Sequence, residues 1–156
     1  MFAYAFPVDK LVQALKYGEQ LTLADALAKR LTQRIAQRPD RIVAMPLHPA
    51  RLRERGFNQS LELARGVARN LGIPLLENSV RRIRNTQPQS ALPWKERKHN
   101  MRNAFACDGN LAGLHIGIVD DVMTSGTTLN ELAQVLRRAG AREVSAWVVA
   151  RTLPHV

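Results

Sequence analysis

The C-terminal part of the chain contains two apolar runs separated by an amphipathic helix, and this arrangement constrains the fold more than any other feature. Residues 114–119 and 143–150 are nearly continuous apolar runs of strand length. Apolar residues at helical spacing predict a helix over 127–139, where Thr128 and Glu131 fit a capping box. Because strands that are apolar on both faces are typical of a parallel sheet, we predict an α/β fold class with a central, mostly parallel sheet flanked by helices.

The rest of the chain supplies further elements for the same fold. The spacing of apolar residues predicts helices over 8–17, from 21 to a stop at 39–40, and over 58–72. Short apolar runs predict strands at 41–47 and 105–107 and a strand pair at 73–76 and 80–84. The arginine-rich stretch 48–59 is expected to be a loop, as are residues 85–103, which hold two prolines and many polar groups.

Length and composition are those of a globular protein. The 156 residues, 46% of them hydrophobic, suit a single domain over 1–156, with a helical N-terminal segment at 1–38 and a core at 41–156. Cys107 is the only cysteine, which excludes a disulfide or a cysteine-based zinc site within these residues. No run approaches the roughly 18 apolar residues of a membrane-spanning helix, and the first residues make a poor signal peptide, so we expect a cytoplasmic location. The net charge of +10 favours anionic partners, such as phosphorylated metabolites, nucleic acid or an acidic protein.

Two adjacent carboxylates, Asp120 and Asp121, end the first of the apolar runs. The loop at 124–128 consists only of Thr, Ser and Gly and leads directly into the predicted helix. A helix N-terminus binds phosphate through its free backbone N–H groups, and Gly126 allows a close approach. Carboxylates instead prefer hydroxyl groups or a divalent cation. A ligand with a phosphate next to a diol, such as a ribose 5-phosphate unit, satisfies both.

Other interpretations of this stretch are weaker. The sequence holds no G-x-x-x-x-G-K-[ST] string, which excludes a P-loop, and no G-x-G-x-x-G dinucleotide fingerprint. An Asp-rich turn followed by a Ser/Thr helix cap would use residues of the same types. However, two adjacent Asp and five consecutive hydroxyl or glycine residues exceed what one cap requires. The four histidines show no metal-ligand spacing, and His115 is expected to be a core or edge group.

The string "IVDDVMTSGTT" resembles the ribose-phosphate signature of type I phosphoribosyltransferases. The resemblance implies that the acidic pair binds the 2- and 3-hydroxyls of phosphoribosyl pyrophosphate (PRPP) and that the following loop binds its 5-phosphate. The PRPP-binding residues that it implies are Asp120, Asp121, Val122, Met123, Thr124, Ser125, Gly126, Thr127 and Thr128. Mg²⁺ is implied as the cofactor, bound through PRPP and not by protein ligands alone.

Further strings resemble one subgroup, the ComF/GntX family of competence-associated proteins. In chain order they are "LKYGEQ", "RLRERGFNQS", "TQPQSAL" and "KERKHNMRNAF". Members of this family commonly begin with a four-cysteine zinc-binding segment, which this sequence lacks, so zinc dependence is not carried over. The resemblance implies a role in DNA uptake and nucleotide metabolism, with residues 1–38 as a hood-like segment that would have to supply the acceptor site.

Two arginine-rich segments are expected to contact the pyrophosphate group. In related transferases the loop after the first strand does so. Of Arg51, Arg53 and Arg55 in this loop we expect Arg53 and Arg55 to make the contact, although a solvated basic turn is the alternative for each. Type I enzymes also carry a flexible loop that closes over PRPP, and the resemblance assigns it to 85–103. The residues implied around this loop are Arg82, Arg84, Thr86, Gln89, Arg97 and Asn100. Arg97 is implied as catalytic, together with the acidic pair.

The sequence thus favours two functions. The first is a phosphoribosyltransferase that moves ribose 5-phosphate from PRPP to an unidentified nitrogen acceptor and releases pyrophosphate. The second is a non-catalytic module that senses PRPP or binds single-stranded DNA, because basic residues surround Trp94, on which a base would stack. For that module a competence helicase-like ATPase is a further expected partner. The sequence does not decide whether the chain forms a homodimer.

Overall fold

The computed structural model describes residues 2–17, 21–85 and 103–152. The helices in these ranges are α1 (Val8–Tyr17), α2 (Leu21–Thr32), α3 (Pro49–Arg55), α4 (Gln59–Leu71) and α6 (Thr127–Arg138). The strands are β1 (Phe2–Ala3), β2 (Arg41–Ala44), β3 (Val80–Arg82), β4 (Phe105–Cys107), β5 (His115–Met123) and β6 (Glu143–Arg151). The loop predicted at 85–103 falls almost entirely outside the described residues. None of the described helices is long and apolar enough to cross a membrane.

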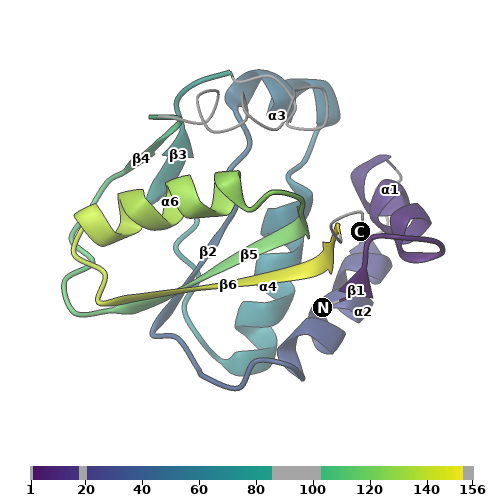
Figure 1. Ribbon diagram of the computed structural model, residues 1–156, viewed down its shortest axis with the longest axis horizontal. Coiled ribbons are helices and arrows are strands. Elements are labelled where there is room, and N and C mark those ends of the chain that lie inside the picture. The colour runs from purple at the N-terminus through teal and green to yellow at the C-terminus, as the bar shows by residue number, and fades with distance from the viewer. Residues whose placement is uncertain (1, 18–20, 86–102, 153–156) are drawn as a thin grey trace.

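Four strands form a parallel sheet in the order β1-β6-β5-β2 (Figure 1). Strand β5 lies in the middle, because Val119 pairs with Ala44 of β2 on one side and Asp120 pairs with Val148 of β6 on the other. This arrangement confirms the predicted parallel α/β sheet. The short edge strand β1 was not predicted, since its two residues are too few to form a periodic pattern.

The remaining strands form a separate antiparallel pair, β3 with β4. The predicted pairing of 73–76 with 80–84 is therefore wrong. Leu75 instead forms a single parallel bridge to Ile42 of β2, so this segment extends the edge of the main sheet. A short apolar run carries no signal for its partner, because pairing depends on contacts between distant parts of the chain.

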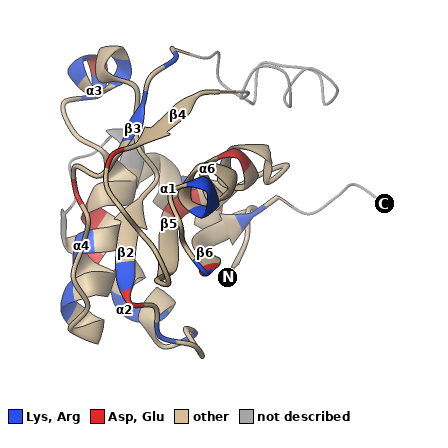
Figure 2. Cartoon of the chain, turned by 90° about the vertical axis from the view of Figure 1, so that its left-hand side faces the viewer, with Lys and Arg blue, Asp and Glu red and all other residues tan. Residues whose placement is uncertain are grey.

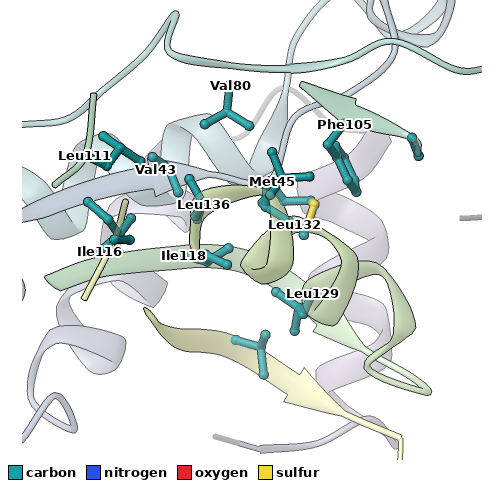
Figure 3. Close-up of a cluster of buried hydrophobic side chains, with 14 residues drawn as sticks. Val43, Met45, Val80, Phe105, Leu111, Ile116, Ile118, Leu129, Leu132 and Leu136 are labelled. Carbon is teal, nitrogen blue, oxygen red and sulfur yellow. The ribbon is translucent and has the colours of Figure 1, made fainter. Parts of the chain in front are cut away.

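Helices cover both faces of the sheet, α6 on one face and α2 with α4 on the other (Figure 1). Side chains alternate along each strand, so Ile42 packs in the α2/α4 cluster and its neighbour Val43 packs in the α6 cluster. In the α6 cluster, Leu132 and Leu136 pack with Ile118 of β5 (Figure 3). The two buried layers hold β5 rigidly, which matters because this strand carries the acidic pair.

The prediction of a loop at 48–59 is wrong, because α3 occupies most of it. His48, predicted as a loop residue, is the N-cap: its Nδ1 accepts a hydrogen bond from the backbone N–H of Ala50 at 3.2 Å. Pro49 follows at the first helical position, where its missing N–H costs nothing. Gly56 ends the helix with a left-handed φ of 83°, and its N–H donates to the Leu52 carbonyl at 2.8 Å. The run of charged residues between these caps has no apolar stripe, so the sequence pattern did not predict this short helix.

Two other boundaries differ from prediction. Strand β5 continues beyond 119 to Met123, so Asp120 and Asp121 lie inside the strand and not after it. Helix α2 ends at Thr32, before the predicted stop at 39–40. In the last turn the Thr32 hydroxyl donates to the Ala28 carbonyl four residues earlier, at 2.8 Å.

Candidate functional site

A cavity of about 320 Å³ opens at the carboxyl ends of β2 and β5. Its walls come from the residues after β2, the end of β5, α3, the first turn of α4, β3 and the turn before α6, with Tyr4 from the N-terminal segment. In parallel α/β sheets ligands bind beyond the carboxyl ends of the strands. The cavity is therefore the candidate functional site.

One capping residue fixes the first turn of α4 against this cavity. The Asn58 side chain accepts a hydrogen bond from the Ser60 N–H at 3.1 Å and donates one to the Met45 carbonyl at 3.0 Å. It therefore caps α4 and also ties that helix to the residue after β2. As a result Gln59 and Ser60, both buried, lie beside the end of β5.

The acidic pair is held by hydrogen bonds from α4 and from its own backbone. The Ser60 hydroxyl donates to Asp120 Oδ1 at 2.8 Å, and Gln59 Nε2 donates to Asp121 Oδ2 at 3.3 Å. The N–H of Asp121 donates to Asp120 Oδ1 at 2.9 Å, and the N–H of Val122 donates to Asp121 Oδ1 at 2.8 Å. These donors fix the orientation of both carboxylates before any ligand binds.

Burial makes the charge on this pair costly. Asp120 is only 8% exposed and Asp121 only 5%. Burial first, and the neighbouring charge of Asp121 second, raise the pKa of Asp120 to about 8, against the opposing hydrogen bond from Ser60. Burial first, and the charge of Arg51 second, lower the pKa of Arg82, whereas Asp120 raises it. A ligand that donates hydrogen bonds or brings positive charge would reduce the free-energy cost of burying these carboxylates.

Three residues of the turn at 124–128 line the cavity. Thr124, Gly126 and Thr128 line it, whereas the hydroxyls of Ser125 and Thr127 hydrogen-bond each other at 2.9 Å. Helix α6 starts at Thr127, directly after its N-cap residue Gly126, whose φ is 75°, and it has no acidic residue in its first turn. Its N-terminal backbone N–H groups therefore present positive partial charge beside the cavity.

The predicted capping box at this helix is wrong. Gly126, and not Thr128, is the N-cap residue, and it has no side chain with which to cap. The carboxylate of Glu131 instead accepts a hydrogen bond from the backbone N–H of Asn103 at 2.8 Å. The contact joins α6 to the segment before β4, a long-range interaction that local spacing does not reveal.

Helix α3, which the sequence did not predict, determines which of its arginines line the cavity. Arg51 and Arg55 line the cavity, because residues four apart share one face of α3. Arg53, between them, is exposed and does not line it. Beyond α3, Arg82 lines the cavity, and Arg84 is exposed outside it. Of the expected pyrophosphate contacts, the structure therefore brings Arg55 and Arg82 together and leaves Arg53 and Arg84 apart.

Some expected residues lie outside the described residues, and some cavity residues were missed. Those outside are Thr86, Gln89, Arg97 and Asn100. The polar cavity residues that were not chosen from the sequence are Tyr4, Arg51, Gln59 and Ser60. The i, i+4 spacing of the two arginines and the Asn-Gln-Ser string at the start of a helix were available signals for three of them. Tyr4 had none, because its place depends on the pairing of β1.

No group of three or more His, Cys, Asp or Glu side chains that could hold a metal ion is found among residues 2–17, 21–85 and 103–152. Of the four histidines, His115 is buried, and its Nε2 lies 2.8 Å from Ser145 Oγ. This confirms the expectation that it is a core group with a hydrogen-bond partner.

Comparisons with known proteins match this chain to one family. A model of the phosphoribosyl transferase domain matches residues 58–153. The DNA utilization protein YhgH of Salmonella typhimurium is 41% identical over 158 residues, which cover 96% of this chain and 70% of that protein. Competence protein F of Haemophilus influenzae is 35% identical over 159 residues, covering 95% of this chain and 69% of that protein.

Solved structures share the fold at low sequence identity. A glutamine PRPP amidotransferase from B. subtilis superposes with a TM-score of 0.60 at 23% identity, over 87% of this chain and 30% of that one. An adenine phosphoribosyltransferase from Thermoanaerobacter pseudethanolicus superposes with a TM-score of 0.52 at 14% identity, over 83% and 82%. The fold, the domain match and the similarity to the competence proteins agree with the resemblance seen in the sequence. The chain belongs to the ComF family of type I phosphoribosyltransferase proteins.

Proposed function

We propose that this chain binds PRPP with Mg²⁺ and transfers its ribose 5-phosphate group to a nitrogen acceptor, releasing pyrophosphate. The observation that carries the proposal is a shared cavity: two buried carboxylates, a helix N-terminus among hydroxyls and three arginines line the same space. PRPP carries a diol, a 5-phosphate and a pyrophosphate. Each of its polar ends therefore has a chemically matched wall.

The ribose end would lie between β5 and α6. Asp120 and Asp121 would accept hydrogen bonds from the 2- and 3-hydroxyls, which relieves the cost of their burial. The backbone N–H groups that begin at Gly126, with the hydroxyls of Thr124 and Thr128, would hold the 5-phosphate. Val122 and Met123 line the cavity between these two groups.

The pyrophosphate end would lie against the arginines. Arg51, Arg55 and Arg82 line the cavity together, and a guanidinium matches the paired oxygens of a phosphate. This set keeps Arg55 and Arg82 from the sequence prediction and adds Arg51. Arg97, Gln89 and Asn100 stay predicted contributors from outside the described residues.

Magnesium fits this site as an ion that arrives with PRPP. The carboxylate oxygens already accept hydrogen bonds from Ser60, Gln59 and the backbone, and the described residues form no larger cluster of metal ligands. The phosphate oxygens of PRPP are themselves the hard ligands that Mg²⁺ prefers. When bound, the ion would neutralise charge on the pyrophosphate.

The residues of this chain would catalyse transfer by position and charge. The acceptor nitrogen forms a bond to C1 of the ribose as the bond from C1 to the pyrophosphate oxygen breaks. Positive charge then develops on the ribose, beside the buried carboxylates, while negative charge leaves toward the arginines. Both charges would thus be stabilised by groups already in place.

Two arginines on one helix provide the test of the proposed site. The wild-type chain should bind Mg²⁺-PRPP by calorimetry and release pyrophosphate with one of a panel of amine and nucleobase acceptors. Arg51→Met should weaken PRPP binding by about 10- to 100-fold, because hydrogen bonds to charged groups contribute about 1.5–3 kcal/mol. Arg53→Met removes the same charge from the exposed face of the same helix and should change the affinity less than about twofold. Equal losses in both variants would mean that binding follows net charge and not this cavity.

The outer arginines favour a second candidate function, binding of single-stranded DNA. In the cartoon of Figure 2, α3 and β3 carry the colour of basic residues, which in these two elements are all arginines, and Arg53 and Arg84 are exposed outside the cavity. Relatives carry the name DNA utilization protein. Fluorescence anisotropy with a labelled single strand should then give salt-sensitive binding that survives Asp120→Asn, since phosphate contacts release counterions. Binding that disappears in that variant, or that is insensitive to salt, would contradict a separate DNA surface.

A further inference from the structure

The side-chain amide of Gln59 connects two charged residues of the cavity. Arg55 Nη1 donates to Gln59 Oε1 at 2.6 Å, and Gln59 Nε2 donates to Asp121 Oδ2 at 3.3 Å. A guanidinium only donates and an ionised carboxylate only accepts, so these partners determine which end of the amide faces which group. Gln59 is only 4% exposed. Loss of either partner would therefore leave a buried polar group without a ready replacement from water.

The backbone makes this connection short and stiff. Arg55 is the last residue of α3 and Gln59 is the first residue of α4. Gly56 turns the chain between them with a left-handed φ of 83°, a conformation that residues with a side chain rarely adopt. Asn58 ties the start of α4 to the Met45 carbonyl. Movement at the end of α3 is therefore expected to reach Gln59 directly.

We propose that Gln59 is a positioning residue that couples the arginine wall of the cavity, formed by Arg51, Arg55 and Arg82, to Asp121. Pyrophosphate at Arg55 and the ribose diol at the acidic pair would then bind cooperatively. The inference rests on the proposed function for its ligand and adds a coupling between the two halves of that site. The positive charge on Arg55 polarises the amide, and a polarised amide donates a stronger hydrogen bond to the carboxylate. A neutral amide transmits this orientation while both charged groups still line the cavity.

The connection can be tested first without any ligand, by NMR of the 156-residue chain. The ¹⁵N–¹H resonances of the Gln59 side-chain amide should move in Arg55→Met and in Asp121→Asn, because each variant changes one partner of the amide. Arg53→Met is the matched control, since it removes an equal charge from the exposed face of the same helix. Resonances that move no further in Arg55→Met than in Arg53→Met would overturn the connection.

A mutant cycle on PRPP affinity then tests the coupling. Gln59→Met should weaken binding. In the double variant Arg55→Met/Gln59→Met, the fold-loss of affinity should be smaller than the product of the two single fold-losses by about threefold or more. Arg51→Met with Gln59→Met should lose the full product, because Arg51 acts on the ligand from its own position. Full products in both pairs would overturn the coupling. If Gln59→Met does not fold, the NMR comparison, which needs no Gln59 variant, still decides the connection.

The two experiments separate this inference from the proposed function. A wild-type chain that fails to bind PRPP would refute the function, while the ligand-free NMR comparison would still test the link from Arg55 to Asp121. Conversely, PRPP binding with independent effects of Arg55 and Gln59 would keep the function and reject the coupling.

Discussion

Replacing Asp120 and Asp121 together with asparagine should lower the affinity for Mg²⁺-PRPP by about 100-fold or more. Each carboxylate is expected to accept a hydrogen bond from a ribose hydroxyl. Above about pH 8, where Asp120 is ionised, bonds to charged groups contribute about 1.5–3 kcal/mol each. Asparagine keeps the shape of the side chain but carries no charge and presents a donor where an acceptor is needed. Calorimetric titration measures the loss directly.

Asp108→Asn is the matched control for that experiment. Asp108 is exposed, forms an ion pair with Arg81 at 2.6 Å and does not line the cavity. The variant should therefore bind PRPP as the wild type does, because an exposed ion pair contributes little to stability. An unchanged affinity in the double variant would exclude the acidic pair as the diol site.

The single change Asp120→Asn should also stabilise the fold in a pH-dependent way. The pKa of Asp120 is raised from 3.8 to about 8 by burial and then by the charge of Asp121, so the folded chain holds this proton more tightly than the unfolded chain does. The wild type therefore loses stability as the pH rises from about 4 to about 8, and the loss levels off above that range. Each unit of pKa displacement corresponds to about 1.4 kcal/mol, so the variant should gain at least about that much at pH 8.

Urea unfolding of both chains at pH 5 and pH 8 measures this gain. The variant should exceed the wild type by more at pH 8 than at pH 5, because ionised Asp120 destabilises only the wild type. A variant that is less stable at pH 8 would show that the acidic pair stabilises the fold. The expected combination, a more stable chain with a weakened site, is what a binding site maintained at the expense of stability predicts.

The parts of the fold that follow from local patterns were predictable from the sequence. Strands β5 and β6 and helix α6 carry long apolar runs or stripes, and all three exist in the structure, with β5 extending past its predicted end to Met123. The pairing of β3 with β4 and the edge strand β1 were not predictable, because they depend on contacts between segments far apart in sequence. The acidic pair was found because two adjacent Asp, followed by five consecutive hydroxyl or glycine residues, exceed what one helix cap requires.

The arginine wall was predicted only in part, and the reason is structural. Treating 48–59 as a loop removes any reason to choose among its arginines, and the choice then included Arg53. As a helix, α3 directs Arg51 and Arg55 to one face, and that face forms the wall. The cap formed by His48 and the glycine at position 56 were the signals for this helix, but seven residues rich in arginine show no apolar stripe. Short helices held by caps are therefore where pattern analysis fails.

Replacing Gly117 with alanine should destabilise the protein by about 1–3 kcal/mol, through overpacking in the layer that supports the acidic pair. A Cβ at this position would lie 2.2 Å from Trp147 Cζ3, 2.4 Å from Trp147 Cη2 and 3.2 Å from Pro39 Cγ. The indole ring therefore packs directly over the glycine, against the neighbouring strand. Thermal unfolding should shift downward by about 2–4 °C for each kcal/mol lost.

A second substitution distinguishes this contact from a backbone effect of glycine. Trp147→Leu removes the ring, so Gly117→Ala should cost much less in that background, with a coupling energy of about 0.5–3 kcal/mol. The same cost in both backgrounds would attribute the loss to backbone conformation and not to the ring. The site should respond as well, since β6 pairs Val148 with Asp120 one residue after Trp147. If displacement of the ring shifts that pair, Gly117→Ala should weaken PRPP binding while the chain stays folded, and Trp147→Leu should restore it.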